Sequence, residues 1–366
     1  MMPDDLLGLN EGTPFFHKEH HLTIQQKAPL IRVDWRFPMN MKPSLIDHGL
    51  HALLIALTLS CGTAAAQAWP EKPVRIIVPS PPGGTGDTLG RIVAQKLSES
   101  MKQAFVIENR PGAGGLLGSD LVAKAPPDGY MLLVSGAASH TIAPTLSKKV
   151  PFDPVRDFTH IALFGGPPGV LAVNSSIPAR DLKEFIAYAK SQPGKLSYGS
   201  PGNGTQSHLA AENFKQMLGI DMVHVPYKGA SLAVNDLVAG HIHAISTTLT
   251  SAVEQIKAGK VRALAVSSAS RVPGLPDVPT FAELGYPELT GVIWFALSGP
   301  AGMPQDIVRQ LNTEVRRILQ LPEVRQRLQP ESIEPGNLDP KAFTAFVAAE
   351  LKRWVPIIRA SGAQVD

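Results

Sequence analysis

The sequence of 366 residues predicts a two-lobed α/β protein, and three observations carry that prediction. Short β-branched runs alternate with helical runs from Lys72 onward, as in βαβ units that build a mostly parallel sheet flanked by helices. Two stretches rich in glycine and proline, 165–169 and 273–291, each lead into an extended apolar run, where the chain can cross between lobes. Glycine-rich loops follow several strand-like runs, at the sheet edge where α/β proteins bind ligands.

Strands are predicted where short apolar runs rich in β-branched residues lie between turn signals. These runs are residues 74–78, 105–108, 131–134, 196–199, 222–225, 244–247 and 263–266. Two further extended runs, 170–173 and 292–297, follow the stretches where the chain can cross.

Helices are predicted where apolar residues recur with the helical period. Leu89, Ile92, Val93 and Leu97 fall on one face, so we expect this helix to pack on a sheet. Two later helices begin near prolines, where a missing N–H costs little. Their apolar stripes contain Ile307, Leu311, Val315 and Ile318 after Pro304, and Phe343, Phe346, Val347, Leu351 and Trp354 after Pro340.

The composition is that of a folded protein that does not bind nucleic acid. Hydrophobic residues make up 44% of the chain and charged residues 18%, far from the composition of disordered chains. The formal net charge of +3 comes from basic residues scattered among acidic ones. A basic stripe with interleaved aromatic residues, which nucleic-acid binding would require, is absent from the sequence.

The segment 41–68 has the pattern of a secretory signal peptide. Lys42 supplies the positive charge, residues 50–59 form an apolar run too short to span a bilayer, and Ala66-Gln67-Ala68 predicts cleavage after Ala68. The single cysteine, Cys61, lies inside this segment, so the mature chain would be free of cysteine and suited to an oxidising compartment.

These patterns divide the chain into four parts. Residues 1–40 are predicted to be a non-native or unstructured extension, with Met41 as the candidate start of translation, and 41–68 to be the signal peptide. The first lobe is predicted to comprise residues 69–169 together with 292–366, and the second lobe residues 170–291.

Two glycine-rich stretches each follow a strand-like run, precede a helical one and carry no obvious catalytic base or nucleophile. They are Val78-Pro79-Ser80-Pro81-Pro82-Gly83-Gly84-Thr85-Gly86-Asp87 and Glu108-Asn109-Arg110-Pro111-Gly112-Ala113-Gly114-Gly115, and both place bare backbone amides at a helix start. A helix start of this kind favours anions. Together the loops resemble those of the tripartite tricarboxylate transporter receptors, the Bug-type periplasmic solute-binding proteins. Further motifs of that family follow in order at residues 69–73, 125–130, 151–158, 202–210, 224–229, 263–266 and 300–302.

The resemblance implies a fold, a function and partners. The fold is the two-lobed periplasmic binding protein fold of type II, with the ligand cleft between the lobes. The function is the capture of a small carboxylate-bearing metabolite in the periplasm, without catalysis, metal or cofactor. The expected partners are that ligand and a membrane permease of the tripartite tricarboxylate type, and the receptor itself is expected to be a monomer that binds no nucleic acid.

The resemblance also implies where ligand contacts lie. In the first lobe they are Gly83, Gly84, Thr85 and Gly86, with Ser139 and His140 after the third strand; in the second they are Gly204, Thr205 and Ser207. Tyr227, in a family motif, and Thr247, at the end of a predicted strand, are further candidates.

Two of these assignments have a structural alternative. The glycines could instead serve tight turns at positive φ. Asp87 is a further candidate, but its charge suits a helix start better than contact with a carboxylate.

The chain departs from the family pattern at two places. Family members commonly have Asn where Ala143 stands, and an Asp-Asn-containing loop where residues 247–251 read Thr-Thr-Leu-Thr-Ser. Ligand specificity could therefore differ from that of typical members. Trp294 and Phe295 are candidates for a wall of the cleft, although large aromatic residues more often lie in the core.

An enzyme is the main alternative. Gly84-Thr85-Gly86 opens a helix and Glu108 ends the next strand, as in a degenerate NAD-dependent oxidoreductase, but Leu89 occupies the third glycine position. A serine hydrolase would require G-x-S-x-G, which the sequence around Ser200 fails to match. His241 and His243 could hold a metal from one strand face, but no third ligand is evident.

Overall fold

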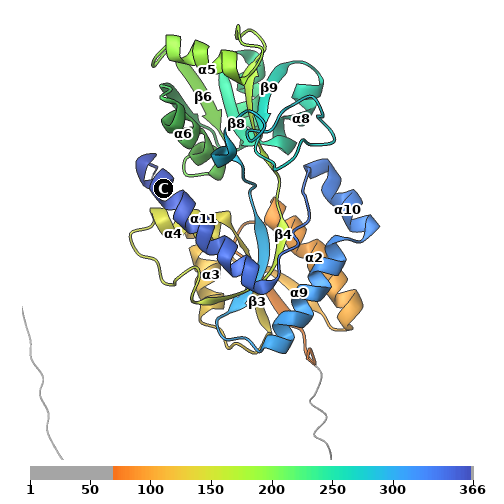
Figure 1. Ribbon diagram of the computed structural model, residues 1–366. Coiled ribbons are helices and arrows are strands. Elements are labelled where there is room, and N and C mark those ends of the chain that lie inside the picture. Colours follow the sequence, from red (N-terminus) through yellow and green to blue (C-terminus); the bar gives the residue numbers. More distant parts are fainter. Residues whose placement is uncertain (1–68, 364–366) are drawn as a thin grey trace, which may run out of the picture. The chain divides into compact units, whose positions relative to one another are not determined.

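The structure, a computed structural model, describes residues 69–363 and contains two five-stranded sheets flanked by helices (Figure 1). The predictions for residues 1–40 and for the signal peptide at 41–68 fall outside the described residues. Within residues 69–363, no helix combines the length and the apolar character that crossing a membrane requires.

The first sheet contains four parallel strands and one antiparallel strand. Its strands are β1 (Val74–Val78), β2 (Phe105–Asn109), β3 (Met131–Gly136), β4 (Phe158–Gly165) and β10 (Phe295–Pro300). Their order is β2-β1-β3-β10-β4, with β1 parallel to β2 and β3, and β10 antiparallel to both of its neighbours. The strand in the fourth position, β10, therefore begins about 130 residues after the end of its neighbour β4.

The second sheet repeats this arrangement. Its strands are β5 (Gly169–Asn174), β6 (Leu196–Ser200), β7 (Met222–Pro226), β8 (Ala244–Thr248) and β9 (Val261–Val266). Their order is β7-β6-β8-β5-β9, with β6 parallel to β7 and β8, and β5 antiparallel to β8 and β9. In each sheet the antiparallel strand is the one that enters from the other sheet. The prediction of a two-lobed α/β fold with mostly parallel sheets is confirmed.

Helices cover both faces of each sheet (Figure 1). Those of the first sheet are α2 (Thr85–Met101), α3 (Leu116–Ala123), α4 (Ala143–Leu146), α9 (Gln305–Leu319), α10 (Pro322–Leu328) and α11 (Pro340–Ala360), with the short turns η1 (Ala113–Gly115), η2 (Ala138–Ile142) and η4 (Gln329–Glu331). Those of the second are α5 (Leu182–Ser191), α6 (Gln206–Leu218), α7 (Ala230–Ala239), α8 (Leu249–Lys257) and η3 (Pro287–Leu289).

The predicted apolar stripes pack as expected. Leu89, Ile92, Val93 and Leu97 of α2 are buried in one core with Leu311, Val315 and Ile318 of α9. Burying a large aliphatic side chain contributes roughly 1.5 to 3 kcal/mol, so these two helices anchor the face of the first sheet. Phe343, Val347 and Trp354 of α11 are likewise buried.

Two segments connect the sheets, and they pair with each other. Pro168 and Val292 form an antiparallel bridge, and the Ile293 N–H donates to Pro167 O at 3.1 Å. The backbones approach so closely that a Cβ on Gly166 would lie 1.9 Å from Ile293 O, which only glycine avoids. The two connecting segments thus lie side by side and antiparallel to each other. The lobe limits at 169/170 and 291/292 remain predictions.

Candidate ligand-binding site

A cavity of about 520 Å³ lies between loops of the two sheets, and we refer to it as the cleft. The first sheet contributes apolar groups and one glycine, and the second contributes mostly polar ones. Its lining residues are Gly114, Ala138, Ile142, Ala143 and Leu146 on the first side; Pro201, Asn203, Gly204, Thr205, Gln206, Ser207 and Thr248 on the second; and Ile293 from a connecting segment. None of these lining residues is ionisable.

Two helix N-termini meet at the polar side of the cleft. Thr205 is the N-cap of α6, and Thr248 is the N-cap of α8. Each helix start carries a partial positive charge and unpaired backbone N–H groups, which favour an anion. A neutral lining with two such helix starts is suited to a small anion such as a carboxylate.

The loop before α6 is held by its own side chains. The Thr205 hydroxyl donates to Gly202 O at 2.8 Å and accepts from the His208 N–H at 3.3 Å. The Gly204 N–H donates to Nδ1 of His208 at 3.1 Å. Among the described residues, the Ser207 hydroxyl has no hydrogen-bond partner. It is therefore a donor from this loop that remains free for a ligand.

Behind this loop lies a stack of three rings, in which Tyr198 and His208 are buried and His224 is half-buried. The rings of His208 and His224 are parallel within 11°, with centroids 3.9 Å apart, and Tyr198 stacks on His224 at 4.9 Å. Burial, and then the neighbouring His208, lower the pKa of His224 to about 4, and burial lowers the pKa of His208. Both rings are therefore neutral near pH 7, as the acceptor role of His208 Nδ1 requires.

Ser200 contacts this stack but does not form a nucleophile. Its Oγ lies 2.7 Å from Nε2 of His224, within the range of a serine–histidine pair. However, Ser200 is fully buried and its hydroxyl also contacts Gly202 O at 3.1 Å. The serine braces the loop from inside, where no substrate reaches it.

The loop before α2 is organised around Asp87. Its carboxylate accepts from the Gly83 N–H at 3.0 Å, Arg91 Nε at 2.9 Å and Asn109 Nδ2 at 2.9 Å. These donors, Arg91 first, lower the pKa of Asp87 to about 2. Because the side chain is buried and its oxygens are occupied, the geometry supports the helix-start role for Asp87 over ligand contact.

The glycines of the same loop have different environments. Gly83 has a φ of +90° and serves the turn, whereas Gly84 is the N-cap of α2 with a φ of −78°, and a Cβ added to it would meet no atom within 4 Å. At Gly86 a Cβ would lie 2.9 Å from the ring of Phe295, which is half-buried at this point. Trp294 is fully buried in the core, and neither Trp294 nor Phe295 is among the described residues that line the cleft.

Residues 83–87 are not among the described residues that line the cleft. Thr85 instead points its hydroxyl at Glu331, 3.4 Å from Oε2. The helix start itself is open, since α2 has no side-chain cap and Gly84 faces empty space.

Ser139 and His140 are buried beneath the cleft. The Ser139 hydroxyl contacts Gly136 O at 3.3 Å and His140 Nδ1 at 3.1 Å. The His140 ring is fully buried beside Phe158, with centroids 4.6 Å apart. Their neighbours Ala138 and Ile142, on the other face of the same turn, line the cleft instead.

Tyr227 and Thr247 also have their side chains turned to the interior of the second sheet. The Tyr227 hydroxyl donates to Asp236 at 2.7 Å, and burial together with Asp236 raises its pKa to about 12. Thr247 is fully buried, while the next residue, Thr248, lines the cleft. Of the ligand contacts predicted from the sequence, Gly204, Thr205 and Ser207 line the cleft. Gly114, Gln206 and Thr248 also line it, although the sequence did not predict them as contacts.

Comparison with known proteins assigns the chain to a family. Residues 89–363 match the model of the tripartite tricarboxylate transporter family receptor. The chain belongs to this family. BugT of Bordetella pertussis is 34% identical over 328 residues, which cover 89% of this chain and 100% of BugT.

Two solved structures show the same architecture. Rpa4515 of R. palustris with adipate is 35% identical, has a TM-score of 0.68 and matches 81% of this chain and 99% of its own. MatC of Rhodopseudomonas palustris with bound malate is 32% identical, has a TM-score of 0.65 and matches 79% of this chain and 100% of its own.

Membership in this family of periplasmic receptors decides between the function classes. The family consists of binding proteins rather than enzymes, which excludes the oxidoreductase alternative. The geometry agrees: Glu108, the candidate ribose-binding acid, pairs with Arg75 at 2.6 Å and also with Arg110. Leu89, at the third glycine position, is buried in the core.

The histidine pair considered for a metal has other contacts. Nδ1 of His243 accepts from the Ser197 N–H at 3.0 Å, and His241 lies 3.3 Å from Asp236. Across residues 69–363, no group of three or more His, Cys, Asp or Glu side chains is placed to hold a metal ion.

Proposed function

We propose that this receptor binds a small carboxylate-bearing metabolite in the cleft, with the carboxylate at the start of α6. The observation that carries the proposal is the convergence of the Thr205 and Thr248 helix starts on a cavity without ionisable side chains. Two related proteins, solved with adipate and with malate, bind carboxylates within the same architecture.

The energies indicate how the carboxylate is held. A micromolar receptor needs about 8 kcal/mol, while a helix N-terminus contributes roughly 0.3 to 1 kcal/mol and up to about 2 when partly buried. Charge-assisted hydrogen bonds at about 1.5 to 3 kcal/mol each supply the larger share. The Ser207 hydroxyl and the backbone amides of the α6 start are the candidate donors from the second sheet.

The first sheet is proposed to add donors when the lobes close. The start of α2 presents backbone amides at Thr85 and Gly86 without a side-chain cap, and Gly84 leaves the approach to them open. A ligand that contacts both helix starts would favour the closed arrangement, because it binds that arrangement more tightly.

The receptor is proposed to act in the periplasm as a monomer and to deliver its ligand to a permease of the tripartite tricarboxylate type. Cleavage after Ala68 belongs to this proposal. N-terminal sequencing of periplasmic protein should begin at Trp69, and full-length protein confined to the cytoplasm would contradict it.

Thermal unfolding with a panel of ligands tests the function. A ligand bound only by the native state, at 100 times its dissociation constant, stabilises the protein by about 2.7 kcal/mol. Malate, succinate, adipate and short monocarboxylates form the panel, with their primary amides as uncharged controls. At least one carboxylate should raise the melting temperature while its amide does not; equal shifts with acid and amide, or none with any acid, would refute the proposal.

A further inference from the structure

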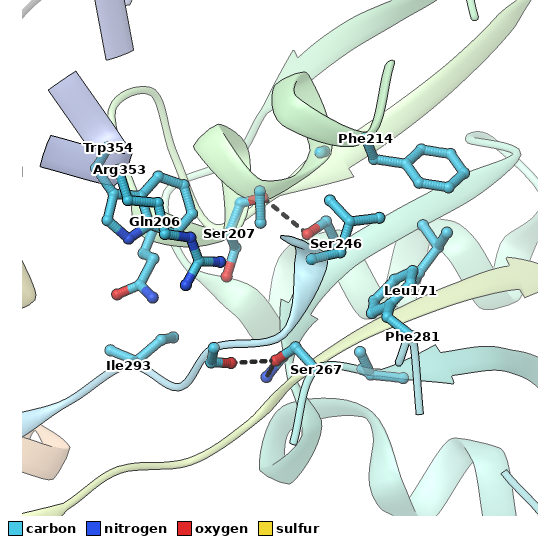
Figure 2. Close-up of a pocket in the computed structure, with 16 residues that line it drawn as sticks. Leu171, Gln206, Ser207, Phe214, Ser246, Ser267, Phe281, Ile293, Arg353 and Trp354 are labelled. Carbon is cyan, nitrogen blue, oxygen red and sulfur yellow. Dashed lines mark hydrogen bonds between the residues drawn. The ribbon is translucent and has the colours of Figure 1, made fainter. Parts of the chain in front are cut away.

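Beside the cleft lies a smaller chamber of about 50 Å³, lined by residues of the second sheet, its helices and loops together with Ile293 and two residues of α11 (Figure 2). The chamber and the cleft share three lining residues, Gln206, Ser207 and Ile293. A water molecule needs about 10 to 15 Å³ on the same scale, so the chamber has room for several water-sized groups. It is therefore a side pocket that adjoins the proposed carboxylate site.

The walls of the chamber are apolar. Ala210, Ala211 and Phe214 line it from α6, Leu171 from β5, and Phe281 and Leu289 from the loops that follow β9. Figure 2 shows the rings of Phe214 and Phe281 on the side away from Gln206. A space lined in this way favours hydrocarbon over water.

Most polar groups around the chamber have partners within the chain; among the described residues the exceptions are the Ser207 hydroxyl and the buried Oε1 of Gln206, an acceptor without a hydrogen-bond partner. The Ser246 hydroxyl donates to Ser207 O at 2.7 Å, and the Ser267 hydroxyl donates to Gly291 O at 2.5 Å (Figure 2). Arg353, the cation at its edge, donates to Glu288 O at 3.1 Å and lies 3.4 Å from Glu350. Glu350 is thus the carboxylate of the chain that faces this cation.

We propose that this chamber is a specificity subsite that takes a small uncharged apolar group of the ligand. The inference rests on the proposed function: the carboxylate lies at the start of α6, and the hydrocarbon end passes Ser207 and Gln206 into the chamber. The Gln206 amide, which donates to Val292 O at 2.9 Å, forms the wall between the two spaces. The favoured ligand class is then a short monocarboxylate with an alkyl end.

A homologous series measures the subsite directly in the unaltered protein. Titration calorimetry would compare acetate, propionate, butyrate and valerate. Each methylene that enters an apolar site should tighten binding about fourfold, until the chamber is full. Succinate, which replaces the methyl end of butyrate with a second carboxylate, should bind more weakly than butyrate.

A variant that fills the chamber tests the subsite, and the same substitution at an exposed position is its control. Ala210→Leu places a larger side chain in the chamber from a half-buried helix position and should flatten the rise along the series. Ala187→Leu makes the same change on an exposed position of α5 and should leave the rise unchanged. Thermal unfolding without ligand checks that both variants are folded.

The outcomes separate the two proposals. A flat series in the wild type, tighter binding of succinate than butyrate, or an unchanged rise in Ala210→Leu overturns the subsite. If dicarboxylates bind while the monocarboxylate series is flat, the receptor function stands and the subsite falls. If no carboxylate of any kind binds, the proposed function itself fails.

Discussion

The loops before α2 and α6 occupy equivalent places in two sheets of the same topology, yet they are built differently. Each follows the strand in the second position of its sheet. The first is locked by the carboxylate of Asp87, which leaves the helix start without a side-chain cap. The second is locked by Thr205 and the neutral ring of His208, which occupy amides of the loop. Loops at equivalent places of the same topology are thus stabilised in different ways, the first by a carboxylate and the second by a threonine and a neutral histidine.

The largest expected effect comes from removing the acid lock. Asp87→Ala leaves Arg91 and Asn109 without the carboxylate to which both donate. We expect the free energy of unfolding to fall by about 2 to 3 kcal/mol, a figure reduced because Arg91 is half-exposed to solvent. Urea denaturation measures this loss.

Asp306→Ala is the matched control. Asp306 also lies in the first turn of a helix and pairs with an arginine one turn on, but its side chain is 91% exposed. Its loss should cost less than about 1 kcal/mol. Equal losses in both variants would show that Asp87 does not lock its loop.

Protonation of His224, which stacks on His208, should destabilise the second loop at a higher pH than protonation of Asp87 destabilises the first. His224 has a pKa of about 4 in the folded protein and near 6.5 when unfolded, so the unfolded state binds the proton first. The free energy of unfolding should therefore fall as pH drops from about 6.5 to 4, and this contribution should level off below pH 4. Because the His224 ring is half-buried, we expect the free energy of unfolding to fall by about 1 to 2 kcal/mol over this interval.

The variant His224→Phe tests this origin, because it keeps the stack on His208 without a titrating group. Its unfolding free energy should depend less on pH over the same interval, with His140, His160 and His208, whose pKa values burial also lowers, still contributing. Glu212 and Lys215, which also face the stack, have opposite charges and pair at 2.8 Å. An unchanged pH profile would locate the acid sensitivity elsewhere.

At the first helix start, Gly84→Val should weaken ligand binding without destabilising the fold. The backbone there suits a β-branched residue, and the added side chain meets no atom of the protein. If a ligand approaches the amides of Thr85 and Gly86, the valine would obstruct it, and we expect affinity for the best carboxylate of the panel to fall about tenfold or more. Unchanged affinity would remove the first loop from the site.

The smallest effect is expected at the second helix start. Thr205→Val removes the cap of α6 and should cost about 1 kcal/mol of stability, with a modest loss of affinity through the loop. Thr205→Ser keeps the hydroxyl and should retain both properties. The effect on affinity is expected to be indirect, because the Thr205 hydroxyl donates to Gly202 O.

The sequence predicted most of the fold, because strand runs and helical stripes are local signals. It missed β4 as a strand, since residues 158–165 contain few β-branched residues and bury His160 among aromatic rings. The partner that makes this segment a strand is β10, far away in the chain.

The candidate site was predicted less completely. Motifs located the loop at Gly204, Thr205 and Ser207, but they could not show which face of a turn is buried. Ser139 and His140 lie beneath the cleft while Ala138 and Ala143 line it. Thr247 and Thr248 differ by one residue and point to opposite sides, as neighbours at a strand end do. That alternation depends on register, which a motif does not specify.

The position of β10 has a consequence for the order in which the protein can assemble during synthesis. All five strands of the second sheet come from one uninterrupted stretch, residues 169–266, whereas the first sheet places β10 between β3 and β4. The first sheet therefore stays open at its centre until residue 300 has left the ribosome, and contacts across such long separations form slowly. We expect the later-encoded sheet to complete first, leaving the edges of β3 and β4 unpaired for chaperones to shield before export.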